Sequence, residues 1–182
     1  MRIIAGKHKR MMLYTLEGAT TRPMMDRMKE SIFNTIGPFF EGGIALDLFA
    51  GSGALGLEAL SRGVSFTYFV ELDKLALEIV KKNVLKAKES SNSSILNMDY
   101  LDALKKFKDN KQKFDIVFLD PPYKLKVINE IIETLINDDL LKDKAIIICQ
   151  IMKKEINLEV KGLEVLKNKS FGHSEVIIFE KV

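Results

Sequence analysis

The sequence has few of the residues that build cross-links and metal sites: one cysteine, two histidines and no tryptophan in 182 residues. A single cysteine excludes an internal disulfide framework, so we expect a reducing compartment. His8 and His173 lie far apart and give no metal-ligand spacing, so no metal cofactor is expected. Cys149 lies inside an apolar run, which is typical of a small core residue rather than an activated thiol.

Long hydrophobic runs are also missing. No apolar stretch approaches the roughly 18 residues that span a bilayer, and the first residues lack the continuous apolar segment of a signal peptide. Hydrophobic residues make up 47% and charged residues 29% of the chain, as in an ordinary soluble globular protein. The length fits one domain with a substantial core. We therefore expect a cytoplasmic protein, with a monomer as the default state.

Acidic residues are absent from the first ten positions, although the net charge of the whole chain is only +3. The cations that gather there are Arg2, Lys7, Lys9 and Arg10. Such a cluster could contact phosphate groups or form a solvated terminal arm. Apolar stretches at residues 2–5 and 13–16 flank this basic turn and predict a β-hairpin. We therefore divide the chain into a hairpin extension, residues 1–22, and a main domain, residues 23–182.

From residue 44 onward, short apolar stretches alternate with amphipathic segments, which predicts strands separated by helices. The expected strands are 44–49, 66–70, 95–98, 114–119, 144–149, 163–167 and 175–180. The expected helices are 23–36, 54–62, 74–88, a short one at 100–107, and one after residue 125. Helical crossovers of this length favour a doubly wound α/β fold with a mostly parallel sheet covered on both faces. The short link at 168–174 predicts an antiparallel last strand.

A glycine-rich segment follows the strand predicted at 44–49. Gly51, Gly53 and Gly56 match the pattern G-x-G-x-x-G, and Glu71 ends the next predicted strand, twenty residues after Gly51. Glycines let the backbone approach a ligand, and an acid at that position can accept hydrogen bonds from ribose hydroxyls. The combination predicts a nucleoside site. The alternative is a tight strand-to-helix turn beside a surface glutamate.

Two further acids indicate which nucleoside is bound. Asp47 stands four residues before Gly51, where the dinucleotide fingerprint is apolar. An acid there can attract a cationic amino group, which S-adenosylmethionine carries and NAD lacks. Asp99 ends the third predicted strand, where it could accept from an adenine amine, cap the following helix, or do both.

The fourth predicted strand ends in Asp120-Pro121-Pro122-Tyr123. In a doubly wound sheet of the usual order this segment would face the glycine loop across one crevice. The Asp120 carboxylate and the Pro121 carbonyl could each accept one N–H of an exocyclic nucleobase amine, and Tyr123 could stack on the base. This arrangement favours methyl transfer to the amine of an unpaired or flipped base, mostly by positioning. A plain turn with a capping aspartate is the alternative.

Four segments resemble the RsmD family of S-adenosylmethionine-dependent 16S ribosomal RNA (guanine-N2)-methyltransferases. They are TRPMMDRMKESIFN, DLFAGSGALGLEALSRG, FVELD and FDIVFLDPPY, and the resemblance runs from the opening RIIAG to the ending FGHSEVIIFEK. Many amino-methyltransferases share DPPY, so TRP-x-x-DR is the more specific element. The resemblance implies a Rossmann-like class I methyltransferase fold of seven strands. It also implies S-adenosylmethionine as the cofactor and a guanine in small-subunit rRNA, within an assembling particle, as the substrate.

The resemblance also implies roles for individual residues. The cofactor site would contain Asp47, Phe49, Ala50, Gly51, Gly53, Glu71, Leu72, Asp99 and Tyr100. The guanine would be held by Asp120, Pro121, Pro122 and Tyr123. RNA would be contacted by Arg2, Lys7, Lys9, Arg10, Arg22 and Arg27. Of the upstream segment, Thr21, Arg22, Pro23 and Arg27 would fold over the cofactor site or touch RNA. Met24 and Met25 depart from the small or hydroxyl residue usual after TRP, which weakens any detailed assignment of RNA contacts.

Three other functions remain open on the residues alone. A DNA adenine methyltransferase shares DPPY, but the length leaves little room for a segment that reads DNA sequence. A nicotinamide oxidoreductase shares the glycine pattern. A silent RNA-binding module would fit the basic terminus, although Asp120 and Glu71 are present and argue against it.

Overall fold

The computed structural model describes residues 1–16, 22–122, 125–152 and 159–182, with the backbone alone for residues 22–24. Its helices are α1 Arg22–Ile36, α2 Ala54–Ser61, α3 Lys74–Ala87, α4 Tyr100–Asp109 and α5 Ile128–Asn137, with a 3-10 turn at Ser90–Asn92. Its strands are β1 Ile44–Asp47, β2 Phe66–Val70, β3 Ser93–Leu96, β4 Phe114–Leu119, β5 Leu141–Met152, β6 Leu163–Phe171 and β7 Ser174–Lys181. The predicted alternation of strands and helices is confirmed.

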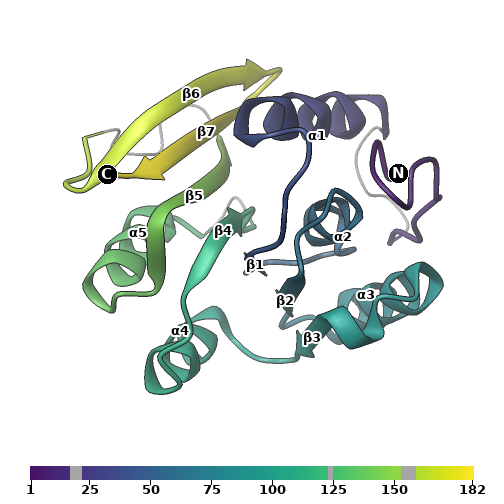
Figure 1. Ribbon diagram of the computed structural model, residues 1–182, viewed down its shortest axis with the longest axis horizontal. Coiled ribbons are helices and arrows are strands. Elements are labelled where there is room, and N and C mark those ends of the chain that lie inside the picture. The colour runs from purple at the N-terminus through teal and green to yellow at the C-terminus, as the bar shows by residue number, and fades with distance from the viewer. Residues whose placement is uncertain (17–21, 123–124, 153–158) are drawn as a thin grey trace.

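The seven strands form one sheet in the order β3-β2-β1-β4-β5-β7-β6 (Figure 1). Strands β1 to β5 pair in parallel, whereas β7 is antiparallel to both β5 and β6. Strands β2 and β3 lie on one side of β1, and β4, the next strand along the chain, lies on its other side. The strand order therefore reverses between β1 and β4, so the sheet has the usual doubly wound order.

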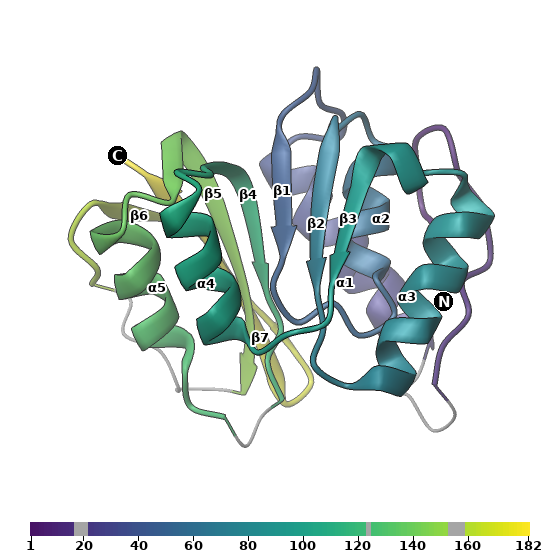
Figure 2. The same cartoon turned by 90° about the horizontal axis from the view of Figure 1, so that it is seen from below.

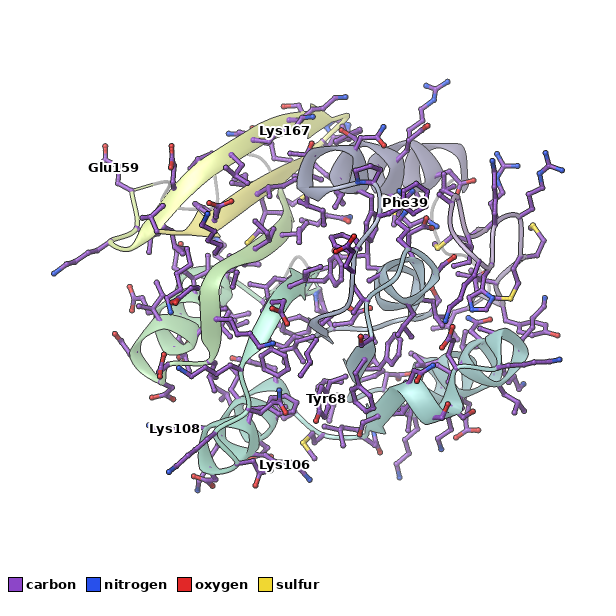
Figure 3. The ribbon with its side chains drawn as sticks, viewed as in Figure 1. Phe39, Tyr68, Lys106, Lys108, Glu159 and Lys167 are labelled. Carbon is purple, nitrogen blue, oxygen red and sulfur yellow. The ribbon has the colours of Figure 1, made fainter. Side chains whose placement is uncertain are left out.

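Helices cover both faces of the sheet (Figure 2). On one face, Ala45 and Phe118 pack with residues of α1 and α2, and α3 lies beside them. On the other face, β-strand residues pack against α4 and α5. There Tyr68 meets the rings of Phe107 and Phe114 edge-on, with centroids 5.1 and 5.8 Å away (Figure 3). Alternation along each strand supplies both faces with apolar side chains, as buried parallel strands require.

Several strands differ in their bounds from the prediction. β1 ends two residues earlier, β3 lies two residues earlier, β7 is one residue longer at each end, and β5 and β6 are much longer. β5 begins at Leu141, which pairs with Phe114 of β4, and ends at Met152, the last residue that pairs with β7. The charged residues at its start, Lys142 to Lys144, hid this extension from the hydrophobic pattern. β6 continues to Phe171 through the polar stretch Lys167–Ser170, because it pairs with β7 and forms the sheet edge, where charged side chains are common.

The amino-terminal segment folds back on itself but forms one isolated antiparallel bridge, Arg2 to Met12, rather than two strands. Ile3 and Leu13 are buried with apolar residues of α2 and α3. Glu58 of α2 accepts hydrogen bonds from the backbone N–H groups of Ile4 and Ala5, at 2.9 and 3.1 Å. The segment is therefore attached to the sheet domain by apolar side chains buried against α2 and α3 and by a buried carboxylate. No helix within the described ranges is both long and apolar enough to cross a bilayer.

Candidate active site

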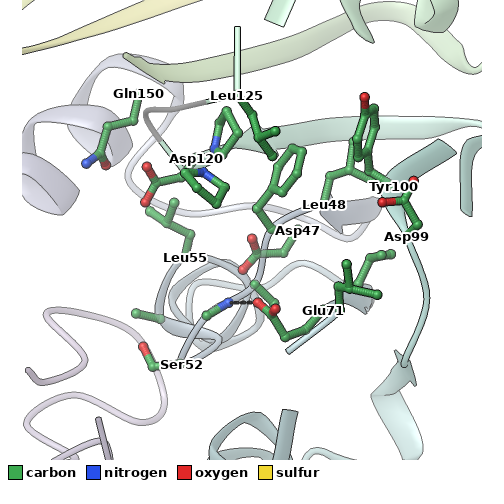
Figure 4. Close-up of a pocket in the computed structure, with 18 of the residues that line it drawn as sticks. Asp47, Leu48, Ser52, Leu55, Glu71, Asp99, Tyr100, Asp120, Leu125 and Gln150 are labelled. Atoms are coloured by element: carbon green, nitrogen blue, oxygen red, sulfur yellow. Dashed lines mark hydrogen bonds between the residues drawn. The ribbon is translucent and has the colours of Figure 1, made fainter. Parts of the chain in front are cut away.

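A cavity of about 440 Å³ opens at the carboxyl ends of the strands, where the strand order reverses (Figure 4). Its walls come from the loop after β1, the ends of β2, β4 and β5, and the start of α4. The polar residues in its lining are Asp47, Ser52, Glu71, Asp99, Tyr100, Asp120 and Gln150. The glycine loop and the Asp120 segment therefore face one crevice, as their positions in the sequence predict.

Asp47 ends β1 and is almost fully buried, at 2% exposure. Its Oδ2 accepts a hydrogen bond of 3.0 Å from the backbone N–H of Gly56 in α2. Burial raises the pKa of Asp47 to about 7, the Gly56 hydrogen bond opposes that shift, and the charges of Asp120 and Glu71 add to it. A cation placed beside Asp47 would relieve both the desolvation and the like-charge repulsion.

Glu71 joins the glycine loop to the end of β2. Its Oε2 accepts from the backbone N–H of Gly51 at 2.8 Å, drawn as a dashed line in Figure 4, and its Oε1 accepts from the N–H of Asp73 at 2.8 Å. These two bonds fix the carboxylate at the cavity wall. Each carboxylate oxygen can accept a further bond, so hydroxyl groups of a ligand remain within its capacity.

Asp99 caps the first turn of α4, where its Oδ1 accepts from the N–H of Leu101 at 2.9 Å. The same residue lines the cavity, so the capping role and a ligand-facing position coexist. The rings of Phe49 and Tyr100 lie beside it with centroids 5.5 Å apart. This end of the cavity thus combines an acceptor with aromatic surface, which suits a heterocycle that carries an amine.

Asp120 follows β4 and lies at the other end of the cavity (Figure 4). It keeps some exposed surface, but the protein around its carboxyl removes enough water to raise its pKa to about 7. Pro121 is buried and Pro122 is exposed, and both line the cavity. Tyr123, predicted to stack on the base, lies outside the described residues.

The three glycines of the motif have different structural roles. Gly51 lines the cavity with a φ of 57°, and a Cβ added there would meet no atom within 4 Å. Gly53 does not contribute to the cavity wall: it caps α2 with a φ of 77°, beside Phe69 and Val80. A Cβ on Gly56 would lie 2.4 Å from the Phe69 ring, so this glycine allows α2 to pack closely on β2. Only the first glycine meets the expectation of a backbone surface facing a ligand.

The residues expected to contact RNA do not gather in one place. Arg2 pairs with Asp26 of α1 at 3.3 Å, and Lys7 pairs with Glu89 at 2.6 Å. The N–H of Lys7 also bonds the carbonyl of Ser61, at the end of α2 that points away from the cavity. The basic turn therefore lies at the far end of α2. Lys9, Arg10 and Arg27 are exposed, whereas the side chain of Arg22 and all of Thr21 lie outside the described structure.

Several lining residues were not predicted. They are Met1, Met25, Leu48, Ser52, Ala54, Leu55, Val70, Met98, Leu125 and Gln150. Most are apolar, and nothing in their local pattern distinguishes a cavity wall from a core. Ser52 and Gln150 are polar. Gln150 could have been found from the sequence, because a polar residue at the carboxyl end of a buried parallel strand stands at the ligand-binding edge of such a sheet. Met25 places one of the two unusual methionines of α1 at the cavity.

The charged residues that line the cavity all have the same sign. Among the described residues that line it, four are acids and none is basic. Such a lining is suited to a ligand with positive charge, and S-adenosylmethionine carries a sulfonium and an ammonium group. No group of three or more His, Cys, Asp or Glu residues within the described ranges could hold a metal ion.

Comparisons with known proteins place this geometry in a family. Residues 1–180 match the family described as Conserved hypothetical protein 95, the RsmD family. The chain belongs to this family. Ribosomal RNA small subunit methyltransferase D of Haemophilus influenzae is 38% identical over 94% of this chain and 89% of its own length. YlbH of Bacillus subtilis is 37% identical over 100% of this chain and 99% of its own length.

A solved structure agrees with this assignment: a putative methylase of Haemophilus influenzae is 34% identical, with a TM-score of 0.81 over 100% of this chain and 98% of its own. A conserved hypothetical protein of Streptococcus pyogenes is 37% identical, with a TM-score of 0.79 over 85% of this chain and 95% of its own. The chain thus has the Rossmann-like class I methyltransferase fold, with the seven-stranded sheet and antiparallel last strand expected from the sequence.

Proposed function

We propose that the protein transfers a methyl group from S-adenosylmethionine to the exocyclic N2 amine of a guanine in 16S rRNA, guanine 966 by family. The observation that carries the proposal is the shared cavity: Asp120 lies at one end of it, and Glu71 and Asp99 lie at the other, with Asp47 between them (Figure 4). A cofactor and an accepting base can therefore meet in one enclosure.

The cofactor would occupy the end of the cavity formed by β1, β2 and α4. Glu71 would accept bonds from the ribose hydroxyls, Asp99 from the adenine amine, and Asp47 from the methionyl ammonium, directly or through water. Phe49, Ala50, Gly51, Leu72 and Tyr100 complete that wall. When bound, S-adenosylmethionine supplies an electrophilic methyl group, and the acids around it offset its positive charge.

The accepting amine would lie between Asp120 and Pro121. Such an amine is a weak nucleophile because its lone pair is delocalised into the base. With one N–H bonded to the Asp120 carboxylate and the other to the Pro121 carbonyl, the nitrogen can pyramidalise and direct its lone pair at the methyl group. The methylated nitrogen must lose one proton, and Asp120, with a pKa raised to about 7, is placed to take it.

RNA would reach the cavity past α1 and the amino-terminal segment. Arg2 and Arg27 stand on or against α1, whose Met25 lines the cavity. Lys7, Lys9 and Arg10 would then contact phosphates further from the acceptor, along the RNA backbone. We accordingly propose residues 1–22 as an RNA-contacting extension. The substrate would be an assembling small subunit in the cytoplasm, and the enzyme a monomer.

Mass spectrometry of 16S rRNA from a deletion strain tests the proposal. We expect one N2-methylguanosine to be lost, and to return when the wild-type gene, but not the Asp120→Asn gene, is supplied. An unchanged N2-methylguanosine content in the deletion strain would overturn the proposed function. Methylation of duplex DNA by the purified protein, with ribosomal particles inert, would replace it with an adenine methyltransferase.

A further inference from the structure

Gln150 has a polar atom that the fold leaves unused. The residue lies near the end of β5, lines the cavity and is 7% exposed. Its amide oxygen Oε1 is fully buried and has no hydrogen-bond partner among the residues that the structure describes. Buried polar atoms are nearly always hydrogen-bonded, because each unpaired one costs free energy. An exception inside a ligand cavity points to a donor that the ligand supplies.

The sheet places Gln150 on the same face as Asp120, at the end of the cavity assigned to the accepting base. Strands β4 and β5 are parallel, with Phe118 opposite Ile148 and Leu119 opposite Cys149. Phe118 and Ile148 both pack on the face that α1 and α2 cover. Because side chains alternate along a strand, Asp120 and Gln150 return to that face. Figure 4 shows them at one end of the cavity, with Asp99 and Tyr100 at the other.

The acceptors at this end match one edge of guanine. Guanine carries its N2 amine next to N1–H, so two adjacent positions of the ring are donors. Adenine carries its N6 amine between N1 and N7, which are both acceptors. Asp120, the Pro121 carbonyl and Gln150 Oε1 would all accept. A guanine with its amine at Asp120 therefore has a further donor to offer, whereas adenine would turn a lone pair toward Oε1.

We propose that Gln150 Oε1 accepts the N1–H of the target guanine and so determines which base is methylated. The inference rests on the proposed function and adds a residue to it. A site built to hydrogen-bond one group discriminates strongly against an analogue without that group, because the partner in the protein is left buried and unpaired. In the free protein Oε1 already lacks a described partner, so its removal should not lower thermal stability.

The test compares guanine with 2-aminopurine, which keeps the 2-amine but has a lone pair in place of N1–H. The acceptor is first mapped with the wild-type protein. Small subunits are then reconstituted from ligated 16S rRNA that has either base at that position, and kcat/KM is measured for each. We expect the wild-type protein to favour guanine about ten- to a hundred-fold. Gln150→Met should lower this ratio at least several-fold, chiefly by slowing guanine, with cofactor affinity retained.

Two further variants separate recognition from structure. Gln150→Glu keeps an acceptor at the same place and should retain the preference for guanine. Thr67→Val removes another buried oxygen without a described partner, on β2 and outside the cavity, and should leave the ratio unchanged. Equal use of the two bases by the wild-type protein, or a wild-type ratio in Gln150→Met, would overturn the role of Gln150 alone. Failure of the wild-type protein to methylate guanine at N2 would instead overturn the proposed function.

Discussion

At the scale of single residues, the cavity contains two carboxyl groups whose charged forms are disfavoured by burial. Asp47 and Asp120 both have a pKa raised to about 7, chiefly because burial disfavours their charged forms. Perturbed acids in a cleft are typical of functional sites. The two differ in their surroundings, since Asp47 has a hydrogen bond from Gly56 while Asp120 faces the end of the cavity assigned to the base.

Replacing Asp120 with Asn should abolish most methyl transfer while most of the affinity for S-adenosylmethionine remains. The amide cannot take the proton that leaves the amine, so we expect kcat to fall about 10²- to 10⁴-fold. Single-turnover transfer and calorimetry measure the two quantities. Asp109→Asn, at the exposed end of α4, is the matched control and should behave as wild type. Loss of cofactor affinity with normal turnover at saturation would contradict the assigned role.

The rate of methyl transfer should also depend on the ionisation of Asp120. The ionised carboxylate accepts the proton, so kcat should rise with pH through about 7 and then level off. Single-turnover rates between pH 5.5 and 8.5, on prebound substrate, would show this rise. A flat profile over that range would exclude Asp120 as the proton acceptor in the rate-limiting step.

Asp47 should lower stability at neutral pH. Its pKa is about 7 in the folded protein and near 3.8 when unperturbed. Between those values the folded state holds a proton that the unfolded chain releases, so the free energy of unfolding falls as pH rises through this window. Asp47→Asn keeps an acceptor for Gly56 and removes the titration. Relative to wild type, its stability should improve by up to a few kcal/mol between pH 4 and pH 8 in urea unfolding. A constant difference would refute the raised pKa.

At the scale of elements, a buried carboxylate connects three parts of the chain. Glu58 of α2 accepts from Lys29 of α1 at 3.2 Å and from Arg62 at 2.8 Å, besides the two amino-terminal N–H groups. The Lys29 ammonium also donates to the carbonyl of Arg2. Burial lowers the pKa of Lys29, and the Glu58 charge opposes that shift. The cluster holds α1 and the amino-terminal segment against α2, and thereby places Met1 and Met25 at the cavity.

Glu58→Gln should therefore destabilise the protein by about 3–5 kcal/mol, because Lys29 and Arg62 are left buried without a counter-charge. The matched control is Glu78→Gln, whose ion pair with Lys81 is more than half exposed on both sides and should matter by less than about 1 kcal/mol. Urea unfolding measures both. Hydrogen exchange at Ile4 and Ala5 should accelerate in the first variant only. Equal effects of the two substitutions would show that the buried cluster does not hold the segment.

At the scale of the whole molecule, the basic turn of the amino-terminal segment lies away from the cavity mouth. Lys9 and Arg10 lie beyond the end of α2 opposite the cavity, next to the ion pair of Lys7 with Glu89. If RNA follows this side, these cations contribute affinity without base selectivity. The net charge of +3 shows none of this distribution.

Substituting Lys9 and Arg10 with Gln should weaken binding to small-subunit particles and make it less sensitive to salt. Each lost phosphate contact should lower the slope of log K against log salt by about 1. Lys105→Gln with Lys106→Gln is the control, because α4 covers the opposite face of the sheet and Lys106 projects from it (Figure 3). An unchanged slope in the first variant would remove the basic turn from the RNA-binding surface.

The sequence by itself determined the alternation of strands and helices and the segments that face the cavity. Hydrophobic period, glycine spacing and an acid at a strand end are local signals, and strong ones here. Only the tertiary structure decided that Gly53 and Gly56 serve helix packing, that the basic turn lies far from Asp120, and that Gln150 stands beside it. Those facts depend on which distant segments meet. Such long-range contacts depend on how the side chains of the whole core pack together, and no short sequence pattern specifies that packing.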